Sequence, residues 1–431
     1  MGERLVVSGG LALDSRGEKA ADLLIGDGII QAIGDPGSFS GLGLTVDASD
    51  ALVMPGFVDI QVHFRTPGGE ESEDITSGAA GAALGGVTAC VMMPNTIPTI
   101  DHPAIVLEVL ELGRGSPCDI HTSASITVGR AGEELVDIAA LHGVGVNVFT
   151  DDGTVVDDPN LMKRALAASH ALPGIVVSQH AEHSAMVEGG VINEGPVSER
   201  LGLKGRPSEA EVVIVDRDIE LARQTGGRYH VLHMSTSAAT QLVRDAKSAG
   251  VQVTAEVTPQ HLILTEDDVE RLGTSGKMNP PLRTASDVAG LRAGVFDGTI
   301  DAIATDHAPH SPASKAMPLA VAPPGMLGVE TMASVIWSEL VAPGLMTPQR
   351  FIALLSSAPA RIAGLEDHGR IIDVGEPANI AVFDPHRRWV INPNHLQSKS
   401  ENTPWPDKEV TGRVRHTICM GDLVVHAESL T

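Results

Sequence analysis

The sequence predicts an α/β fold in which a (β/α)8 TIM barrel carries a small β-sandwich domain built from both termini. Three observations predict it: eight apolar runs alternate with helix-like segments, polar side chains follow the ends of those runs, and short β-like runs occur near both termini. The chain has 431 residues, of which 42% are hydrophobic, so it is long enough for one large domain and one smaller one.

The β-sandwich is expected from residues 1–54 together with residues 368–431. Both segments contain short β-like runs that glycine and aspartate turns separate. Neither segment could bury a core alone, so we expect the two to pair. Two independent surface flaps are the alternative, and they would leave strand edges open. Examples of the runs are Leu5–Val7, Asp22–Ile25, Asn379–Phe383 and Leu423–Val425.

The barrel is expected over residues 55–367, where helix-like segments such as Ala131–Leu141 and Ser208–Thr225 separate the apolar runs. A doubly wound open sheet is the competing fold. It is disfavoured because no run ends in a glycine-rich phosphate loop. The eight runs are Val58–Phe64, Val87–Met93, Ile120–Ile126, Val144–Phe149, Ile175–Ser178, Tyr229–Met234, Val251–Val257 and Ile300–Ala304.

The composition excludes several classes of partner. The net charge of -25 argues against nucleic acid and against anionic membranes. No stretch is long and apolar enough to span a bilayer, and the first residues lack the apolar core of a signal peptide. The cysteines Cys90, Cys118 and Cys419 are spaced too widely for a disulfide framework or a zinc knuckle. We expect a cytoplasmic protein in a reducing compartment.

Polar side chains follow most of the predicted strands. The carboxyl ends of parallel barrel strands meet at one mouth, so we expect these side chains to lie close together. A single histidine there is more often a core residue than a ligand. Several histidines and carboxylates together favour a zinc-like metal, whereas His183 and His230 are expected to be surface or supporting groups. The clustered side chains are His63, Arg65, Asn95, Asp151, Asp152, His180, His233 and Asp306.

The aspartates of this set have alternative explanations. Asp151 and Asp152 precede Gly153 and could belong to a simple capped turn, but their place after the fourth run favours a carboxylate that bridges two metals. Asp306 follows the last run, where an aspartate has few structural duties. A carboxylate beside a metal can accept the proton of an activated water and pass it on.

Gln61 stands where the first strand calls for a second metal-binding histidine. Gln61, His63 and Arg65 alternate along the strand and share one face. Two imidazoles at positions 61 and 63 would clamp a divalent metal, but one of the two side chains is an amide here. A neutral carbonyl oxygen is a poorer zinc ligand than imidazole.

Further motifs accompany these strand ends. They are Pro55–Asp59, Arg65–Gly68, Met93–Thr96, Thr254–His261, Lys277–Arg283, Ala304–His310 and Ser398–Pro404. Together they resemble the class I dihydroorotases of the amidohydrolase superfamily, and the resemblance runs through most of the chain. It is much more specific than a bare His-x-His pattern.

The resemblance implies a set of metal ligands and a proton carrier. Asp152 would be the bridging carboxylate, and His180 and His233 would complete one metal site. His63 and Asp306 would belong to the other metal, and Asp306 would also be the catalytic proton shuttle. The implied cofactor is Zn2+, with one or two ions per chain.

The resemblance also implies substrate-binding residues. Arg65, Asn95 and His310 correspond to residues that hold the substrate carboxylate, and a guanidinium suits a carboxylate. Asn279 corresponds to a residue that contacts the pyrimidine ring. The loop 322–328, with Pro324 and Gly325, would pass over the substrate, although a plain surface turn explains its glycines equally well.

The implied reaction is the reversible hydrolysis of the cyclic amide of dihydroorotate to N-carbamoyl-L-aspartate, a step of de novo pyrimidine (UMP) biosynthesis. An activated water would attack the ring carbonyl, and Asp306 would hand its proton to the departing nitrogen. The related hydantoinases, dihydropyrimidinases and allantoinases usually bridge their metals with a carboxylated lysine. This chain has the pair Asp151 and Asp152 at the corresponding strand end and no lysine, which favours dihydroorotase.

Gln61 departs from the family pattern, which has histidine there. Three consequences of this glutamine are open. Gln61 ligates its metal weakly, or the metal nearest Gln61 is lost while Asp152, His180 and His233 keep the other, or the enzyme is inactive. Some members of the family have lost catalysis and serve as structural partners of aspartate transcarbamoylase, which is the alternative function. Those members tend to lack several ligands, whereas this chain lacks one, so we expect an active enzyme and a homo-oligomer.

Overall fold

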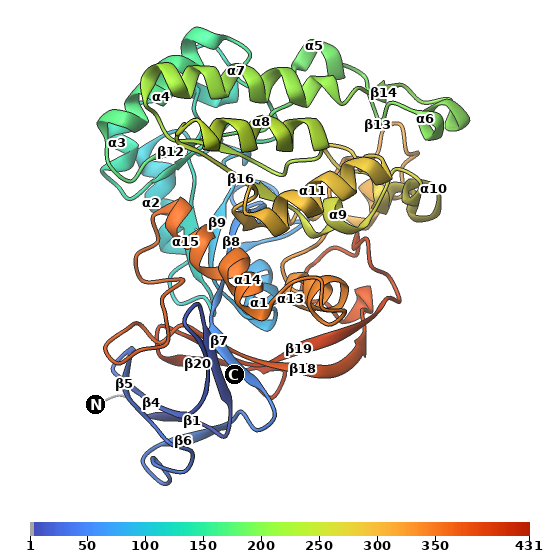
Figure 1. Cartoon of the computed structure of the whole chain (residues 1–431). Coiled ribbons are helices and arrows are strands. Elements are labelled where there is room, and N and C mark those ends of the chain that lie inside the picture. Colours follow the sequence, from blue (N-terminus) through green and yellow to red (C-terminus); the bar gives the residue numbers. More distant parts are fainter. Residues whose placement is uncertain (1–3) are drawn as a thin grey trace.

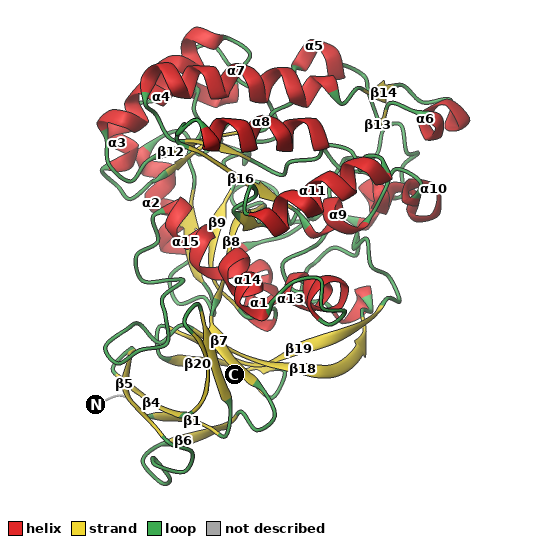
Figure 2. Cartoon of the chain, viewed as in Figure 1, coloured by secondary structure: helices red, strands yellow, loops and turns green. Residues whose placement is uncertain are grey.

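A computed structural model describes residues 4–431 of the chain (Figure 1). It contains a barrel of parallel strands with helices around it and a β-domain that lies below the barrel in the view of Figure 1. Figure 2 shows the same division by secondary structure, with the red helices gathered around the barrel and the lower domain made almost entirely of yellow strands. The predicted fold class is confirmed.

The barrel has eight strands, which pair in parallel in two groups: β8, β9 and β10, and then β11, β12, β15, β16 and β17. Parallel bridges join Ala124 to Phe149 and Val62 to His307, so the two groups close into one barrel. The strands are β8 (Phe57–Val62), β9 (Val87–Met92), β10 (Asp119–Thr122), β11 (Val148–Phe149), β12 (Val176–Gln179), β15 (Tyr229–Val231), β16 (Val253–Val257) and β17 (Ala302–Ile303).

Helices cover the outside of the barrel, and their ends follow local sequence signals. Asp74 begins the first helix with a capping box, and Thr284 does the same for α11, because each side chain binds a free backbone N–H of the first turn. The helices longer than nine residues are α1 (Ile75–Leu84), α2 (Pro103–Leu112), α4 (Pro159–Ala171), α7 (Glu209–Thr225), α8 (Ser237–Ser248) and α11 (Ala285–Asp297), and the short helix α15 (Ala358–Ala363) also packs on the barrel.

Shorter elements fill the connections between strands and helices. The short helices are α3 (Ile138–His142), α5 (Ser184–Val187), α6 (Pro196–Leu201), α9 (Pro259–Ile263), α10 (Asp268–Leu272), α12 (Pro312–Lys315), α13 (Met332–Ile336) and α14 (Pro348–Ile352). The short strands β13 (Ile192–Asn193) and β14 (Gly205–Arg206) pair with each other outside the barrel.

The predicted helix Ala131–Leu141 is wrong over most of its length. Only α3 is helical there, and the preceding residues form a loop in which Thr127 bridges Leu135. Gly129 and Gly132 both have positive φ, 61° and 72°, which breaks a helix at that point. The apolar periodicity of the segment reflects burial of Val136 and Ile138 in the core rather than one continuous helix.

The β-domain combines both ends of the chain, as predicted. A four-stranded sheet has the order β5-β4-β1-β6, and a seven-stranded sheet has the order β21-β20-β19-β18-β7-β2-β3. The strands are β1 (Leu5–Ser8), β2 (Leu11–Asp14), β3 (Gly17–Ala20), β4 (Asp22–Gly26), β5 (Ile29–Gly34), β6 (Leu44–Asp47), β7 (Leu52–Pro55), β18 (Ile380–Val390), β19 (Glu409–Cys419), β20 (Asp422–His426) and β21 (Ser429–Leu430).

The joining of the two ends is visible in the register. Strand β18 pairs antiparallel with β7, and Ile380 lies opposite Pro55. One apolar core contains Leu23 and Val46 from the first segment and Ile380 and Ile418 from the last. The division at residues 54 and 368 stays a prediction. Within residues 4–431, no helix has the length and apolarity needed to cross a membrane.

Candidate metal centre

The five candidate metal ligands lie at the carboxyl ends of five barrel strands. His63 directly follows β8, His180 directly follows β12, and Asp152, His233 and Asp306 come two or three residues after their strands. All five side chains are buried, with exposed fractions of 1–5%. Their donor atoms form two overlapping groups, Asp152–His180–His233 and His63–Asp152–Asp306. The convergence that the sequence predicted is present.

The first group, which we call the His180 half, has the dimensions of a metal site. His180 Nδ1 lies 3.0 Å from His233 Nε2. Asp152 Oδ1 lies 3.3 Å from His233 Nε2 and 3.7 Å from His180 Nδ1. Ligands of a tetrahedral zinc ion bound at about 2.0–2.2 Å lie about 3.3–3.6 Å from one another. The three atoms can therefore form one face of a tetrahedron with little rearrangement.

The second group, which we call the Gln61 half, uses the other oxygen of the same aspartate. His63 Nε2 lies 3.2 Å from Asp152 Oδ2 and 3.0 Å from Asp306 Oδ1. The backbone N–H of His63 donates to the carbonyl of His307 at 2.8 Å, and this bond holds Asp306 beside the end of β8. Asp152 thus presents one carboxylate oxygen to each half.

Gln61 lies at the centre of this arrangement, and its amide nitrogen faces the carboxylate. Its Nε2 donates to Asp152 Oδ1 at 3.3 Å. Its Oε1 is buried and has no hydrogen-bond partner among residues 4–431. In this orientation Gln61 competes with a cation for Asp152. Ligation by Oε1 would require the amide to turn over, which brings an oxygen toward the carboxylate and is favourable only with a cation between them.

The electrostatics of the His180 half favour cations. Burial opposes ionisation of Asp152, but hydrogen bonds from His180 and His233 outweigh it and hold the pKa of Asp152 well below its ordinary value. Burial lowers the pKa of His180, yet bonds to Asp152 and Glu182 raise that pKa to about 9. Without a metal the site therefore attracts a proton, which occupies the place of a positive ion.

Neighbouring polar groups orient the ligand histidines His180 and His63, and two of these groups, Glu182 and Arg206, were not among the residues predicted from the sequence. Glu182 Oε2 lies 3.1 Å from His180 Nε2, and Arg206 donates to the same oxygen at 2.8 Å. Asn95 Oδ1 lies 2.8 Å from His63 Nδ1. A ligand histidine usually donates its second N–H to a carboxylate or a carbonyl, which was the signal that could have identified Glu182 two residues after His180.

The neighbouring Asp151 and His230 have structural roles. Asp151 accepts hydrogen bonds from the backbone N–H groups of Ile126 and Thr127, at 2.7 and 3.0 Å, and from the Thr127 hydroxyl. His230 is not a surface group, because it is 1% exposed and lies 3.1 Å from Glu256 inside the barrel. The capped-turn explanation therefore fits Asp151, while Asp152 faces the mouth.

Three residues of the mouth have unusual backbone conformations. Arg65, His233 and Asp306 have φ values of 57°, 31° and 49°. Non-glycine residues rarely adopt positive φ, and such strain concentrates at functional sites where the surrounding fold enforces it. The strained backbone at these three positions therefore indicates that they serve to orient their side chains in the mouth and not to stabilise the fold.

The candidate substrate-binding residues line one side of the mouth. Arg65 Nε donates to the carbonyl of Pro309 at 3.2 Å, and His310 Nε2 donates to the carbonyl of Pro324 at 2.7 Å. His310 thereby ties the loop 322–328 to the mouth. Gly325 has φ 147°, and a side chain there would meet the carbonyl oxygen of Ala308 at 2.6 Å, so the loop fits only with glycine.

Asn279 is connected to the mouth only indirectly. Lys277, two residues before Asn279, contacts the loop 322–328, because its carbonyl accepts a hydrogen bond from the N–H of Gly325 at 2.8 Å. The Oδ1 of Asn279 is buried without a partner in the described part of the chain. An unpaired buried acceptor is costly, so it is available to a ligand N–H.

A parallel barrel with buried histidines and aspartates at its mouth and a β-sandwich from both termini defines the amidohydrolase class. Solved structures share this fold: L-hydantoinase (dihydropyrimidinase) from Arthrobacter aurescens has a TM-score of 0.89 at 23% identity, over 100% of this chain and 98% of that one. Dihydropyrimidinase from Brevibacillus agri NCHU1002 has a TM-score of 0.86 at 21% identity, over 99% and 96%.

Sequence comparisons narrow the class to a family. Residues 50–239 match the family described as dihydro-orotase-like. The dihydroorotase of Mycobacterium tuberculosis is 42% identical over 403 residues, which are 93% of this chain and 94% of that protein. The dihydroorotase of Streptomyces coelicolor is 41% identical over 418 residues, 96% and 97% of the two chains. The chain belongs to the dihydroorotase family.

Proposed function

We propose that this chain hydrolyses the cyclic amide of dihydroorotate reversibly, giving N-carbamoyl-L-aspartate, with a divalent metal held mainly by the His180 half of the mouth. Family membership supports the reaction. The observation that carries the metal assignment is the group of three buried donor atoms, two imidazole nitrogens and one carboxylate oxygen, that lie 3.0–3.7 Å apart. Imidazole and carboxylate are the ligands that zinc prefers.

The residues of the His180 half suit a catalytic metal. Asp152, His180 and His233 supply three protein ligands, and catalytic zinc sites commonly have three with a fourth position left open. Two imidazole nitrogens at 3.0 Å need a cation or a proton between them. A bound divalent ion supplies Lewis acidity, because it polarises a carbonyl oxygen and lowers the pKa of water. We expect Zn2+ as the natural ion.

Asp306 is the proposed proton carrier. Its Oδ1 lies 3.0 Å from His63 Nε2, and the carboxylate sits at the mouth beside Asp152. When water attacks the ring carbonyl carbon, Asp306 accepts a proton from that water and gives it to the ring nitrogen as the C–N bond breaks. The second proton of the water is released to solvent as the new carboxyl group ionises, so the products are a carboxylate, a neutral carbamoyl nitrogen and a proton. The same steps in reverse take up that proton and close the ring.

Arg65 and His310 are proposed to hold the substrate carboxylate. Burial lowers the pKa of Arg65 to about 10, so its guanidinium still carries a charge at neutral pH. Burial, together with the nearby Arg65, lowers the pKa of His310 to about 3, so this imidazole is neutral. A buried guanidinium binds a carboxylate with paired N–H groups. Asn95 would assist Arg65, in addition to orienting His63.

Asn279 and the loop 322–328 are proposed to complete the pocket. The unpaired Oδ1 of Asn279 suits a ring N–H of the substrate. Pro324 and Gly325 lie where the backbone can approach the substrate closely, because Gly325 has no side chain and His310 fixes the carbonyl of Pro324. The ring would then lie between an acceptor on one side and the metal on the other.

The proposal is tested by metal analysis of the purified chain together with an assay for dihydroorotate hydrolysis. We expect bound zinc and turnover, and we expect turnover to fall strongly in Asp306→Asn. His386→Ala serves as a control, because His386 is exposed on β18 and belongs to none of the metal-ligand groups found in residues 4–431. Absence of turnover in a zinc-loaded chain would contradict the proposal. Co-purification with aspartate transcarbamoylase would then favour the structural role.

A further inference from the structure

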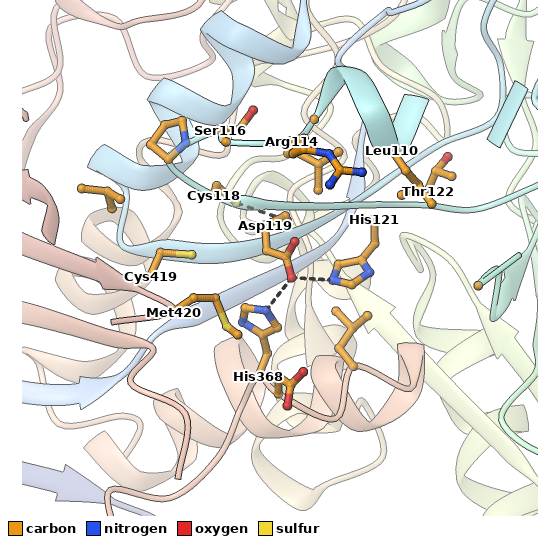
Figure 3. Close-up of a pocket in the computed structure, with 18 of the residues that line it drawn as sticks. Leu110, Arg114, Ser116, Cys118, Asp119, His121, Thr122, His368, Cys419 and Met420 are labelled. Atoms are coloured by element: carbon orange, nitrogen blue, oxygen red, sulfur yellow. Dashed lines mark hydrogen bonds and ion pairs between the residues drawn. The ribbon is translucent and has the colours of Figure 1, made fainter. Parts of the chain in front are cut away.

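A third group of metal-ligand side chains lies at the opposite end of the barrel. Asp119 is the first residue of β10, His121 follows it by two residues, and His368 lies in the linker that leads from α15 to β18. Residues i and i+2 of a strand share one face, so Asp119 and His121 point the same way. Figure 3 shows the carboxylate of Asp119 between the imidazoles of His121 and His368, with an interaction drawn to each.

One carboxylate oxygen holds the group together. Asp119 Oδ2 lies 3.0 Å from His121 Nε2 and 3.0 Å from His368 Nε2 (Figure 3). The three donor atoms lie within 4.8 Å of one another. In a tetrahedral site with bonds of about 2.0–2.2 Å, two ligand atoms lie about 3.3–3.6 Å apart. The two oxygen–nitrogen separations need to widen by only a few tenths of an ångström to admit an ion.

The side chains can make that adjustment. Asp119 and His121 are partly exposed, with side-chain exposures of 42% and 33%, while His368 is 1% exposed and fixed. They line a cleft of about 1140 Å3 between the barrel and the last strands of the β-domain, which Cys419 and Met420 also line (Figure 3). An ion can therefore enter from the cleft.

His368 has the support that metal-binding histidines have. Its Nδ1 lies 3.3 Å from the hydroxyl of Thr88, and that hydroxyl lies 3.3 Å from the carbonyl of Phe57. When Thr88 donates to Phe57, it accepts from the Nδ1–H of His368. The lone pair of His368 Nε2 then faces Asp119, which is favourable only with a cation between the two.

We propose that Asp119, His121 and His368 form a separate divalent-cation site of the zinc type, which we call the base site. Its fourth position faces the cleft. The ion joins the start of a barrel strand to the linker that enters the β-domain, so it fastens the two domains together. Two imidazoles and one carboxylate suit Zn2+ better than Ca2+ or Mg2+, which prefer oxygen ligands.

The base site is tested by counting zinc ions in the full chain after saturation with ZnCl2 and dialysis. We expect His121→Ala to hold one ion per chain fewer than the wild type, with unchanged dihydroorotate turnover. Asp119→Asn, which preserves side-chain shape, should show the same loss. His386→Ala is the matched control and should keep the full count.

A stability measurement gives a second readout. The rise in Tm on adding zinc should be smaller in His121→Ala than in the wild type, because an ion that binds only the folded chain stabilises it. Equal ion counts in wild type, His121→Ala and Asp119→Asn would overturn the proposal. The count does not depend on catalysis, so failure of the proposed function would leave this test intact.

Discussion

The two halves of the barrel mouth share Asp152 but differ in what surrounds it. The His180 half has two imidazoles at 3.0 Å, and Glu182 supports one of them. The Gln61 half has one imidazole, and Gln61 donates an N–H to Asp152 where a ligand lone pair would be needed. The difference teaches that one amide can remove a ligand from one metal site while the neighbouring site keeps its own three, although the N–H of Gln61 shares Oδ1 of Asp152 with the His180 half.

The largest effect is expected where the two halves meet. Asp152→Ala removes a ligand from both, so we expect loss of zinc from the mouth and a fall in kcat/KM of about 10^4-fold or more, since the metal contributes several kcal/mol. Zinc counting and turnover measure this. Asp151→Asn is the matched control: it should keep zinc and lower Tm, because Asp151 binds the backbone of Ile126 and Thr127. Retained turnover in Asp152→Ala would contradict the account.

Asp306 belongs to the Gln61 half alone, so its replacement separates catalysis from metal binding. Asp306→Asn should lower kcat by about 10^2–10^3-fold through loss of proton transfer. The ion of the His180 half should remain, because no ligand of that half is changed. Measurement of kcat and of bound zinc in the same preparation shows whether the variant loses proton transfer alone or its metal as well. Loss of all mouth zinc in this variant would show that the two halves are not independent.

Glu182 supports only the His180 half. Glu182→Gln should lower zinc affinity at the mouth by about 10–100-fold, as loss of such a partner typically does. A competition titration with a zinc chelator measures this change. Glu73→Gln is the control, since Glu73 is also a buried carboxylate beside a histidine but contacts His307 at 3.4 Å. Equal affinities in the two variants would mean that Glu182 does not position His180.

Gln61→His is expected to remove the difference between the halves. An imidazole at position 61 replaces a hydrogen-bond donor to Asp152 with a ligand, so the chain should bind one more zinc ion at the mouth. Zinc counting measures this gain. Gln61→Asn, which remains an amide, should show none. An unchanged count in Gln61→His would show that Gln61 is not what weakens this half.

The smallest effect concerns stability near the Gln61 half. Burial would raise the pKa of Glu73, but His307, Ser398 and Ser77 outweigh it and hold that pKa below its ordinary value. A carboxyl group whose pKa is lower in the folded than in the unfolded chain stabilises the fold at pH values above its unfolded pKa, which is about 4.3. This stabilisation is lost as the pH falls through the folded pKa. Glu73→Gln should therefore lower the unfolding free energy at pH 7 by about 1–3 kcal/mol.

The destabilisation caused by Glu73→Gln should be smaller at acid pH. The difference between wild type and Glu73→Gln should shrink as the pH falls below about 4.3, which denaturant unfolding at several pH values measures. A constant difference from pH 7 downward would show that the charge of Glu73 contributes nothing. The matched control is Glu71→Gln, because Glu71 is exposed.

Much of the fold was predictable because barrel strands are buried apolar runs with polar residues at their ends. His63, His180 and His233 were found in this way, and the structure brings them together as expected. The break in the expected helix Ala131–Leu141 was not predictable, because Val136 is buried from a loop and Ile138 from the short helix α3, and together they imitate the periodicity of one longer helix. The spacing of apolar residues in the sequence cannot distinguish one long helix from a buried loop followed by a short helix.

The supporting contacts were beyond the sequence because they join distant segments. Glu182 lies beside His180 in the chain, but Arg206, which donates to its carboxylate, comes 24 residues later in the long connection between β12 and α7. The choice between Asp151 and Asp152 rested on the family resemblance, whereas the structure gives its reason in the bonds of Asp151 to Thr127. The base site joins positions 119 and 368, whose proximity no motif indicates.

The most direct test of the central claim is turnover as a function of bound zinc. Metal-free His121→Ala, in which only the mouth should bind tightly, would be reconstituted with increasing ZnCl2, and dihydroorotate hydrolysis would be measured at each loading. The account predicts that turnover rises with the first bound ion and then levels off. Turnover that begins only with a second ion, or none at full loading, would contradict the assignment of the working metal to the His180 half.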